Sequence, residues 1–219
     1  MSPANIWIKI CGNTSLADAK LAADSGADAV GFVFAASPRR VTPEQVAAII
    51  PHLPATLEKI GVFVDASFEE IEATVLTSGL TGVQLHFDAE PALAAKLRER
   101  FGPALRILRV IHFGAEIAPA IMPGPNVDAI LIDSRNATSV GGTGQTFDWA
   151  LASKTLFQNA AASKLVAAGG LSPENVAQAI ATLRPWGVDV VSGVEASPGR
   201  KDPAKVQAFI ANARRTMRS

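Results

Sequence analysis

Short apolar segments rich in valine, isoleucine and phenylalanine recur along the whole chain and predict eight β-strands. These strands are predicted at residues 6–11, 27–34, 60–64, 83–86, 105–111, 129–133, 164–168 and 188–192. Segments of helical composition alternate with them, at residues 15–25, 43–51, 67–78, 90–101, 115–121, 147–157, 173–183 and 203–217. Three helices are predicted to begin with a capping residue followed by proline, at Thr42-Pro43, Ser172-Pro173 and Asp202-Pro203.

The alternation of strand and helix, repeated without a linker, predicts an α/β protein with a (β/α)8 TIM barrel, as a single compact domain over residues 1–219. An open doubly wound sheet is the structural alternative. It is disfavoured because the first strand ends in CGNTS and not in a GxGxxG turn, and because eight units would make a wide sheet for 219 residues. A helix-covered barrel has no open sheet edge, which favours a monomer over a dimer.

Composition and charge exclude several classes of protein. Hydrophobic residues make up 48% of the chain and charged residues 18%, which excludes intrinsic disorder. Twenty basic residues balance twenty acidic ones, so we expect no nucleic-acid or membrane partner. No apolar run approaches the roughly 18 residues of a membrane helix, and no signal peptide precedes the first strand, so a cytoplasmic protein is expected.

The metal-ligating and thiol residues are few. A single cysteine, Cys11, forbids an internal disulfide and a cysteine-based metal cluster, and it favours a reducing compartment. The three histidines, His52, His86 and His112, lack the paired spacing of a zinc site. No bound metal is therefore expected.

Alternation along the predicted strands places ionisable side chains inside the barrel. Trp7, Lys9 and Cys11 share one face of the first strand, and Asp133 ends the sixth with the same inward parity. The carboxyl ends of barrel strands form the mouth where active sites lie, so Cys11 and Asp133 are candidates for chemistry. Each also has a structural interpretation: Cys11 as a buried thiol that only packs, and Asp133 as a carboxylate that caps a turn.

Further side chains are predicted to face the same mouth. Gln84 and His86 share a face of the fourth strand, and Asp189 has inward parity on the eighth. His86 alone is more typical of a structural histidine. Arg39 follows the second strand and suits a substrate carboxylate, although paired arginines are also typical of a solvated turn.

Two glycine-rich turns come late in the chain and predict a phosphate site. Gly169 and Gly170 follow the seventh strand, and Ser192 and Gly193 follow the eighth. Glycine lets backbone N–H groups approach an anion closely, and barrels commonly hold phosphate between these two loops. Either turn alone could be an ordinary strand-to-helix connection. A third cluster, GGTGQT at residues 141–146, lacks the lysine of a nucleotide-binding loop and suits a loop that closes over the mouth.

Basic residues also gather near the end of the last predicted helix. These are Arg214, Arg215 and Arg218. Cations are favoured at a helix C-terminus by the helix dipole, so we interpret them as a solvated helix end and not as a binding patch.

In combination, these motifs resemble the phosphoribosylanthranilate isomerase family of tryptophan biosynthesis. The matching segments are KICG at 9–12, GADAVGFVF at 26–34, SPR at 37–39, VQLH at 83–86, GGTGQTFDW at 141–149, AGGLSPEN at 168–175 and DVVSGVE at 189–195. The resemblance implies a (β/α)8 enzyme that rearranges an aminoaldose, N-(5′-phosphoribosyl)anthranilate, into a 1-deoxyribulose phosphate. It implies no metal and no organic cofactor, and a small phosphorylated molecule as substrate.

The resemblance also implies roles for individual residues. Asp133 matches the general acid that opens the sugar ring, and Cys11 matches the general base that removes the proton from C2′. Arg39 matches the residue that holds the anthranilate carboxylate, and Asp189 matches a substrate-contacting aspartate. The phosphate grip falls on the backbones of Gly169, Gly170, Ser192 and Gly193. A thiol needs a lowered pKa to act as a base, and Lys9 on the same face is the expected positive neighbour.

Two positions depart from the family pattern, and three alternative functions remain open. Phe87 replaces the usual glycine after the fourth-strand histidine, and Val191 replaces a common serine near the phosphate. Related barrels, an indole-glycerol-phosphate synthase or the histidine-pathway aminoaldose isomerase, are the enzymatic alternatives. The first needs a catalytic lysine and a longer N-terminus, and the second usually carries aspartate where Cys11 stands. A phosphate-binding barrel without catalysis would have lost the acid or the base.

Overall fold

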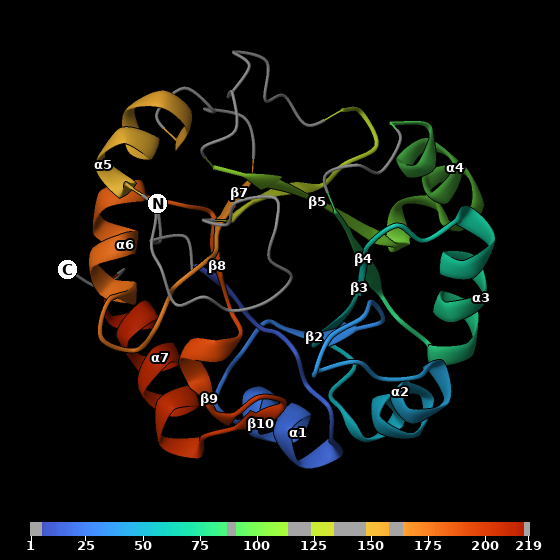
Figure 1. Ribbon diagram of the computed structural model, residues 1–219, viewed down its shortest axis with the longest axis horizontal. Helices are drawn as coiled ribbons and strands as arrows, with labels where there is room; N and C mark the ends of the chain where they lie inside the picture. The colour runs from blue at the N-terminus through green and yellow to red at the C-terminus, as the bar shows by residue number, and fades with distance from the viewer. Residues whose placement is uncertain (1–5, 87–90, 114–123, 134–147, 158–163, 217–219) are drawn as a thin grey trace.

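The eight predicted strands close into a parallel β-barrel surrounded by helices in the computed structural model of the chain (Figure 1). The structure describes residues 6–86, 91–113, 124–133, 148–157 and 164–216. The barrel strands are β1 Trp7–Ile10, β2 Ala29–Val33, β3 Glu58–Phe63, β4 Gly82–Leu85, β5 Arg106–His112, β6 Ala129–Asp133, β7 Leu165–Ala167 and β8 Gly187–Val190. The predicted TIM barrel is confirmed, and the open-sheet alternative is wrong because β1 pairs with β8.

Helices cover the outside of the barrel after every strand except β5, whose connection to β6 lies largely outside the described residues (Figure 1). They are α1 Leu16–Asp24, α2 Pro43–Ile49, α3 Phe68–Ser78, α4 Pro91–Phe101, α5 Trp149–Ala152, α6 Val176–Leu183 and α7 Pro203–Arg215. Short helical turns extend some connections: η1 Ile50–His52, η2 Gly102–Ala104, the π-helical η3 Ser153–Phe157 and η4 Ser192–Val194. The helix predicted at residues 115–121 lies outside the described residues.

Two layers of apolar packing hold this arrangement together. Outward-facing strand residues such as Ile8, Ile10 and Phe32 are fully buried against the helices. A second cluster fills the barrel interior and comprises Trp7, Ala29, Ile60, Leu108, Val110, Ala129, Leu131, Val166 and Ala168. Gly187 makes this filling possible, because a Cβ there would lie 2.9 Å from the Trp7 ring. The interior is a packed core below the mouth, as in other barrels of this type.

Side-chain caps fix the helix starts and with them the loops at the mouth. Thr42 and Asp202 cap α2 and α7 ahead of proline, as predicted. The third predicted start, at Ser172-Pro173, is wrong. Residues 173–175 form a turn and α6 begins at Val176, because the Asn175 side chain is used within the loop: it accepts from the Ser172 N–H and donates to the Gly170 carbonyl.

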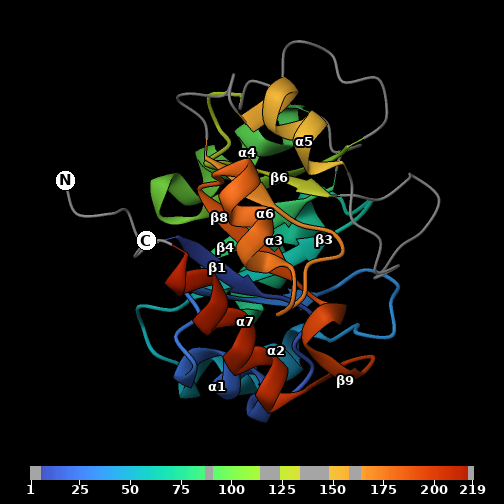
Figure 2. The same ribbon diagram turned by 90° about the vertical axis from the view of Figure 1, so that its left-hand side faces the viewer.

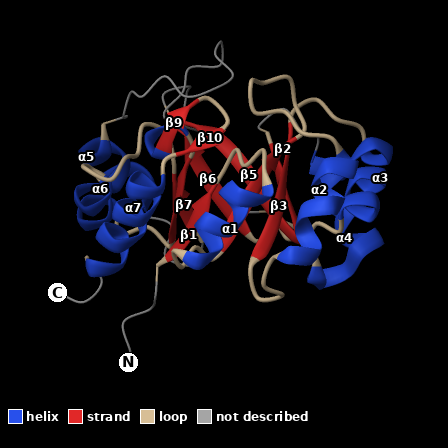
Figure 3. Cartoon of the chain, turned by 90° about the horizontal axis from the view of Figure 1, so that it is seen from below, coloured by secondary structure: helices blue, strands red, loops and turns tan. Residues whose placement is uncertain are grey.

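A small antiparallel hairpin that the sequence pattern did not predict follows β8. It consists of β9 Glu195–Ser197 and β10 Arg200–Lys201, and it lies over one end of the barrel (Figure 3). The hairpin leads into α7, which packs between α6 and α1 (Figure 2).

Arg214 near the end of α7 is not a solvated side chain, so that part of the prediction is wrong. Its Nη2 lies 2.7 Å from Asp28 Oδ2 and 3.0 Å from the Gly26 carbonyl, and Nη1 bonds the Ile6 carbonyl. The guanidinium therefore ties the last helix to the start of β1 and the loop before β2. Within the described residues, no helix is long and apolar enough to cross a membrane.

Candidate active site

The inward face of β1 carries a buried lysine at the centre of the barrel. Lys9 is completely buried, and its Nζ lies 2.8 Å from Gln84 Oε1 on β4 and 2.9 Å from Asp189 Oδ1 on β8. These bonds confirm the inward parity predicted for Lys9, Gln84 and Asp189. The lysine joins three strands across the barrel just below the mouth.

The charge of Lys9 is held by its neighbours. Burial alone would lower the pKa of Lys9, but the Asp189 carboxylate and then the Cys11 thiol raise it above its ordinary value. The ammonium is therefore retained at neutral pH. Lys9 forms an ion pair with Asp189, which is also buried. The negative charge of Asp189 partly cancels the positive field of Lys9.

Cys11 follows β1 directly and lies at the barrel mouth, with 3% of its surface exposed. Its thiol packs against β2 at Gly31, where a Cβ would lie 2.5 Å from Sγ. Burial raises the pKa of the thiol above its ordinary value, and Asp189 adds to this, while Lys9 and Lys201 lower it. The predicted help from Lys9 is present, but burial outweighs it, so the overall lowering expected from the sequence is not found.

Asp133 is the last residue of β6 and is also buried, with 6% exposed. It stands opposite His112 in the β5–β6 register, and the His112 ring lies 5.7 Å from the ring of His86 on the neighbouring side. The predicted rim position of Asp133 is confirmed. The loop predicted to close over the mouth, residues 141–146, lies outside the described residues, as does Phe87.

Arg39 lies on the loop after β2 and is 7% exposed, so the solvated-turn interpretation is wrong for this residue. Its Nε and Nη2 donate to the two carboxylate oxygens of Glu195, at 2.8 and 2.7 Å. Gly12 makes room for the side chain, because a Cβ there would lie 2.8 Å from Arg39 Cδ. The edge of the guanidinium formed by Nε and Nη2 is thus bound within the protein, and Nη1 takes no part in this pair.

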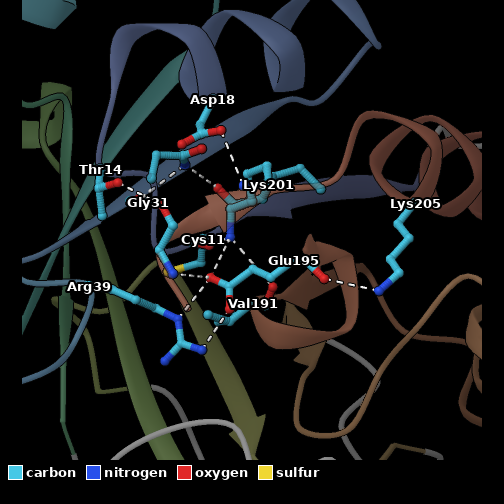
Figure 4. Close-up of polar contacts among 12 residues, drawn as sticks. Cys11, Thr14, Asp18, Gly31, Arg39, Val191, Glu195, Lys201 and Lys205 are labelled. Carbon is cyan, nitrogen blue, oxygen red and sulfur yellow. Dashed lines mark hydrogen bonds and ion pairs between the residues drawn. The ribbon is translucent and has the colours of Figure 1, made fainter. Parts of the chain in front are cut away.

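Lys201 is a site residue that the sequence analysis missed. From β10 its buried Nζ donates to the Cys11 carbonyl at 2.6 Å and lies 3.2 Å from Glu195 Oε1 (Figure 4). It follows Glu195 by only six residues, but no periodicity marks a hairpin that folds back onto β1. A lysine two residues after Gly199, close after SGVE, was the one available signal.

The two glycine-rich loops predicted to hold phosphate touch each other. Gly169 and Gly170 both have left-handed backbone, with φ of +79° and +65°. A Cβ at Gly193 would lie only 1.9 Å from the Leu171 carbonyl oxygen, so this contact requires glycine. Ser192 begins the short η4 turn beside it. The structure brings the loops after β7 and β8 together at the mouth, as the phosphate prediction requires.

Two hollows open beside the mouth, over the ends of β2, β3 and β4. One, of about 340 Å³, is lined by residues that include Phe63, His86 and Lys96, and the other, of about 430 Å³, by residues that include Arg40. The described residues that line them do not include Cys11 or Asp133. Among the described residues, no group of three or more histidine, cysteine or acidic side chains could hold a metal ion.

These features define a (β/α)8 barrel whose ionisable side chains and glycine loops meet at the carboxyl ends of the strands. The family model described as N-(5'phosphoribosyl)anthranilate (PRA) isomerase matches residues 8–212. The chain is 45% identical over 212 residues to the N-(5'-phosphoribosyl)anthranilate isomerase of Pelobacter propionicus, covering 96% of this chain and 97% of that protein.

Two solved structures agree with this match. A phosphoribosyl anthranilate isomerase in complex with reduced 1-(o-carboxyphenylamino)-1-deoxyribulose 5-phosphate is 35% identical, with a TM-score of 0.76 over 95% of this chain and 98% of that one. Monomers generated from the dimeric isomerase of Thermotoga maritima are 37% identical, with a TM-score of 0.79 over the same shares of the two chains, 95% and 98%. The chain belongs to the N-(5′-phosphoribosyl)anthranilate isomerase family, the isomerases of tryptophan biosynthesis.

Proposed function

We propose that the chain catalyses the Amadori rearrangement of N-(5′-phosphoribosyl)anthranilate by general acid–base catalysis, with Asp133 as the acid and Cys11 as the base. One observation carries the assignment: both side chains stand at the carboxyl ends of strands of one closed barrel, on β6 and directly after β1. An acid and a base held at one mouth can act on neighbouring atoms of a single bound substrate.

The acid step opens the sugar ring. Protonated Asp133 gives its proton to the furanose ring oxygen, the bond between C1′ and that oxygen breaks, and the anthranilate nitrogen supplies the electron pair of the resulting Schiff base. Burial of Asp133 at the end of β6 shields the transferred proton from bulk water.

The base step moves a proton from C2′ to the enzyme. The Cys11 thiolate removes it, the electron pair forms the C1′–C2′ double bond, and the iminium nitrogen becomes neutral. The product is the enol form of the 1-deoxyribulose phosphate. Because burial raises the pKa of Cys11, the thiolate depends on the neighbouring ammonium groups of Lys9 and Lys201.

Binding uses the remaining site residues. Arg39 is proposed to hold the anthranilate carboxylate through the guanidinium side that Glu195 leaves available, and Asp189 to contact the substrate. The backbones of Gly169, Gly170, Ser192 and Gly193 are proposed to bind the phosphate. We therefore propose that these side chains and backbone groups bind the substrate and that no metal or cofactor takes part.

We also propose the location, the domain organisation and the oligomeric state of the protein. We place it in the cytoplasm, as one barrel domain over residues 1–219 and as a monomer, although the Thermotoga maritima relative is a dimer. Sedimentation equilibrium of the purified chain tests the last point: a mass near 22.8 kDa supports a monomer and twice that mass contradicts it.

The activity itself is tested by following the fluorescence of N-(5′-phosphoribosyl)anthranilate after purified protein is added. The proposal predicts rapid loss of this fluorescence without added metal or cofactor. Fluorescence that persists, with the substrate shown to be chemically intact, would contradict the proposed function.

A further inference from the structure

A buried network of three charged side chains connects the end of β1 with the hairpin after β8. Arg39 comes from the loop after β2, Glu195 and Lys201 come from the hairpin, and the three side chains meet beside Cys11 (Figure 4). The exposed fractions of the Lys201 and Glu195 side chains are 0% and 4%. Charges this deeply buried are costly unless they are paired, so the network is a built feature and not a surface ion pair.

Lys201 makes the contact that reaches the proposed base. Its Nζ donates to the Cys11 carbonyl at 2.6 Å, and it lies 3.4 Å from the Val191 carbonyl at the end of β8. The Lys201 ammonium therefore binds the carbonyl groups at the ends of two adjacent barrel strands, β1 and β8. One of these carbonyl groups belongs to Cys11, the residue that carries the thiol.

The same ammonium also holds the partner of Arg39. Glu195 Oε1 lies 3.2 Å from Lys201 Nζ and 2.8 Å from Arg39 Nε. Burial would raise the pKa of Glu195, but Arg39 and Lys201 lower it, so the carboxylate stays charged. A fixed, charged Glu195 sets the plane of the Arg39 guanidinium and thereby the direction of its remaining N–H groups.

The hairpin that carries Lys201 is anchored from outside the network. The Lys201 N–H donates to Asp18 Oδ1 at 3.1 Å, and the Thr14 hydroxyl donates to the Gly199 carbonyl at 2.6 Å. On the other side, Lys205 Nζ lies 3.0 Å from the Glu195 carbonyl. The hairpin backbone is thus tied to the loop after β1, to α1 and to α7, and these contacts fix the position of Lys201.

We propose that Lys201 is a positioning residue for the isomerase reaction: its ammonium fixes the backbone of Cys11 and, through Glu195, orients Arg39. This inference rests on the proposed roles of Cys11 and Arg39. The three network charges sum to one positive charge beside the thiol, which also favours the thiolate that the base step needs. A neutral side chain at position 201 could neither form an ion pair with Glu195 nor supply that positive charge.

The sequence composition makes a direct test possible. The chain has one cysteine and no tyrosine, so the ultraviolet absorbance change of an ionising thiol reports Cys11 alone. The charged groups that act on this thiol are Lys9 on its own strand, Asp189 on β8, Lys201 on β10 and Arg39 after β2. Replacing Lys201 removes one positive charge from this set and leaves the charges of the other three groups unchanged.

We expect Lys201→Met to shift the Cys11 titration, measured without substrate, to higher pH. With substrate present, Lys201→Met should lower kcat by about 10- to 100-fold, because small misplacements of a catalytic group have effects of this size. The rising limb of the pH profile of kcat/KM should move to higher pH by the same amount as the thiol titration. Lys201→Arg, which keeps the charge, should return both profiles toward those of the unmodified chain.

Lys59→Met is the matched control, because Lys59 is also a buried lysine whose Nζ donates to a backbone carbonyl, that of Pro54 at 2.7 Å. It lies near the start of β3, away from the mouth. We expect it to alter stability without moving the thiol titration or the pH profile.

Several outcomes would overturn the proposal. A folded Lys201→Met with unchanged thiol titration and kcat would do so, and so would equal effects of Lys201→Met and Lys59→Met. If Lys201→Met does not fold, Glu195→Gln is the second test. We expect it to raise KM by a larger factor than it lowers kcat, and an unchanged KM would contradict the role of the network in orienting Arg39.

The thiol titration needs no substrate, so it tests the role of Lys201 even if the unmodified chain proves inactive. An inactive unmodified chain would overturn the proposed function instead.

Discussion

Gly193 lies where the two glycine-rich loops touch, and its lack of a side chain is required there. A Cβ would lie 1.9 Å from the Leu171 carbonyl oxygen, which is backbone and cannot rotate away. We expect Gly193→Ala to separate the loops and to raise KM by about tenfold or more, equivalent to a loss of about 1.4 kcal/mol of binding. Steady-state kinetics measures this, with kcat expected to change less.

Gly124→Ala is the control for this prediction, because no atom of the described residues lies within 4 Å of a Cβ at Gly124. We expect its kinetics to match those of the unmodified chain. An unchanged KM in folded Gly193→Ala would show that the loops after β7 and β8 do not bind the phosphate together.

The sequence predicts the direction of single side chains well where strand alternation governs them. Lys9 and Asp189 face the interior as their parity requires, because a strand offers only two faces. Alternation says nothing about partners far apart in the sequence. The sequence therefore predicts only that Arg39 binds a substrate carboxylate. In the structure its guanidinium pairs with Glu195, which lies 156 positions later in the chain.

At the scale of elements, the start of α3 shows how local sequence fixes a helix beside the mouth. The Ser67 side chain accepts from the Glu70 N–H, and the Glu70 side chain accepts from the Ser67 N–H, which completes a capping box. We expect Ser67→Ala to lower the free energy of unfolding by about 1 kcal/mol, measured by urea denaturation. Ser67→Asp, which retains an acceptor, should lose less, and equal stability of Ser67→Ala and the unmodified chain would contradict the prediction.

Strands and helices of the barrel were predictable because each has its own periodicity or cap. Residues 129–133 are predicted and found as a strand without change. The β9–β10 hairpin was not predicted, since its strands have three and two residues, too short for a pattern. Its position depends on tertiary bonds from Thr14 and Asp18, which no local signal reveals.

At the scale of the whole molecule, the buried carboxylate of Glu195 links the stability of the fold to pH. Its pKa is below the ordinary value of 4.5, because Arg39 and Lys201 outweigh the effect of burial. The unfolded chain therefore takes up this proton more readily in acid. Its contribution to stability is full above the ordinary pKa and is lost as the pH falls through the lowered value.

We expect the free energy of unfolding to fall in that acidic range and Glu195→Gln to show a weaker dependence on pH there. Urea denaturation between neutral and acidic pH measures both slopes. The same slope in both proteins would show that Glu195 keeps no charge-dependent bond in the folded state.

The closed barrel places Cys11 and Asp133 at one mouth, and the proposed mechanism depends on their acting as base and acid. The most direct test is the turnover of Cys11→Ala and of Asp133→Asn in the fluorescence assay, with thermal unfolding showing that each variant is folded. We predict that each substitution lowers kcat by about 10²- to 10⁴-fold. A rate near that of the unmodified chain in either folded variant would contradict the account.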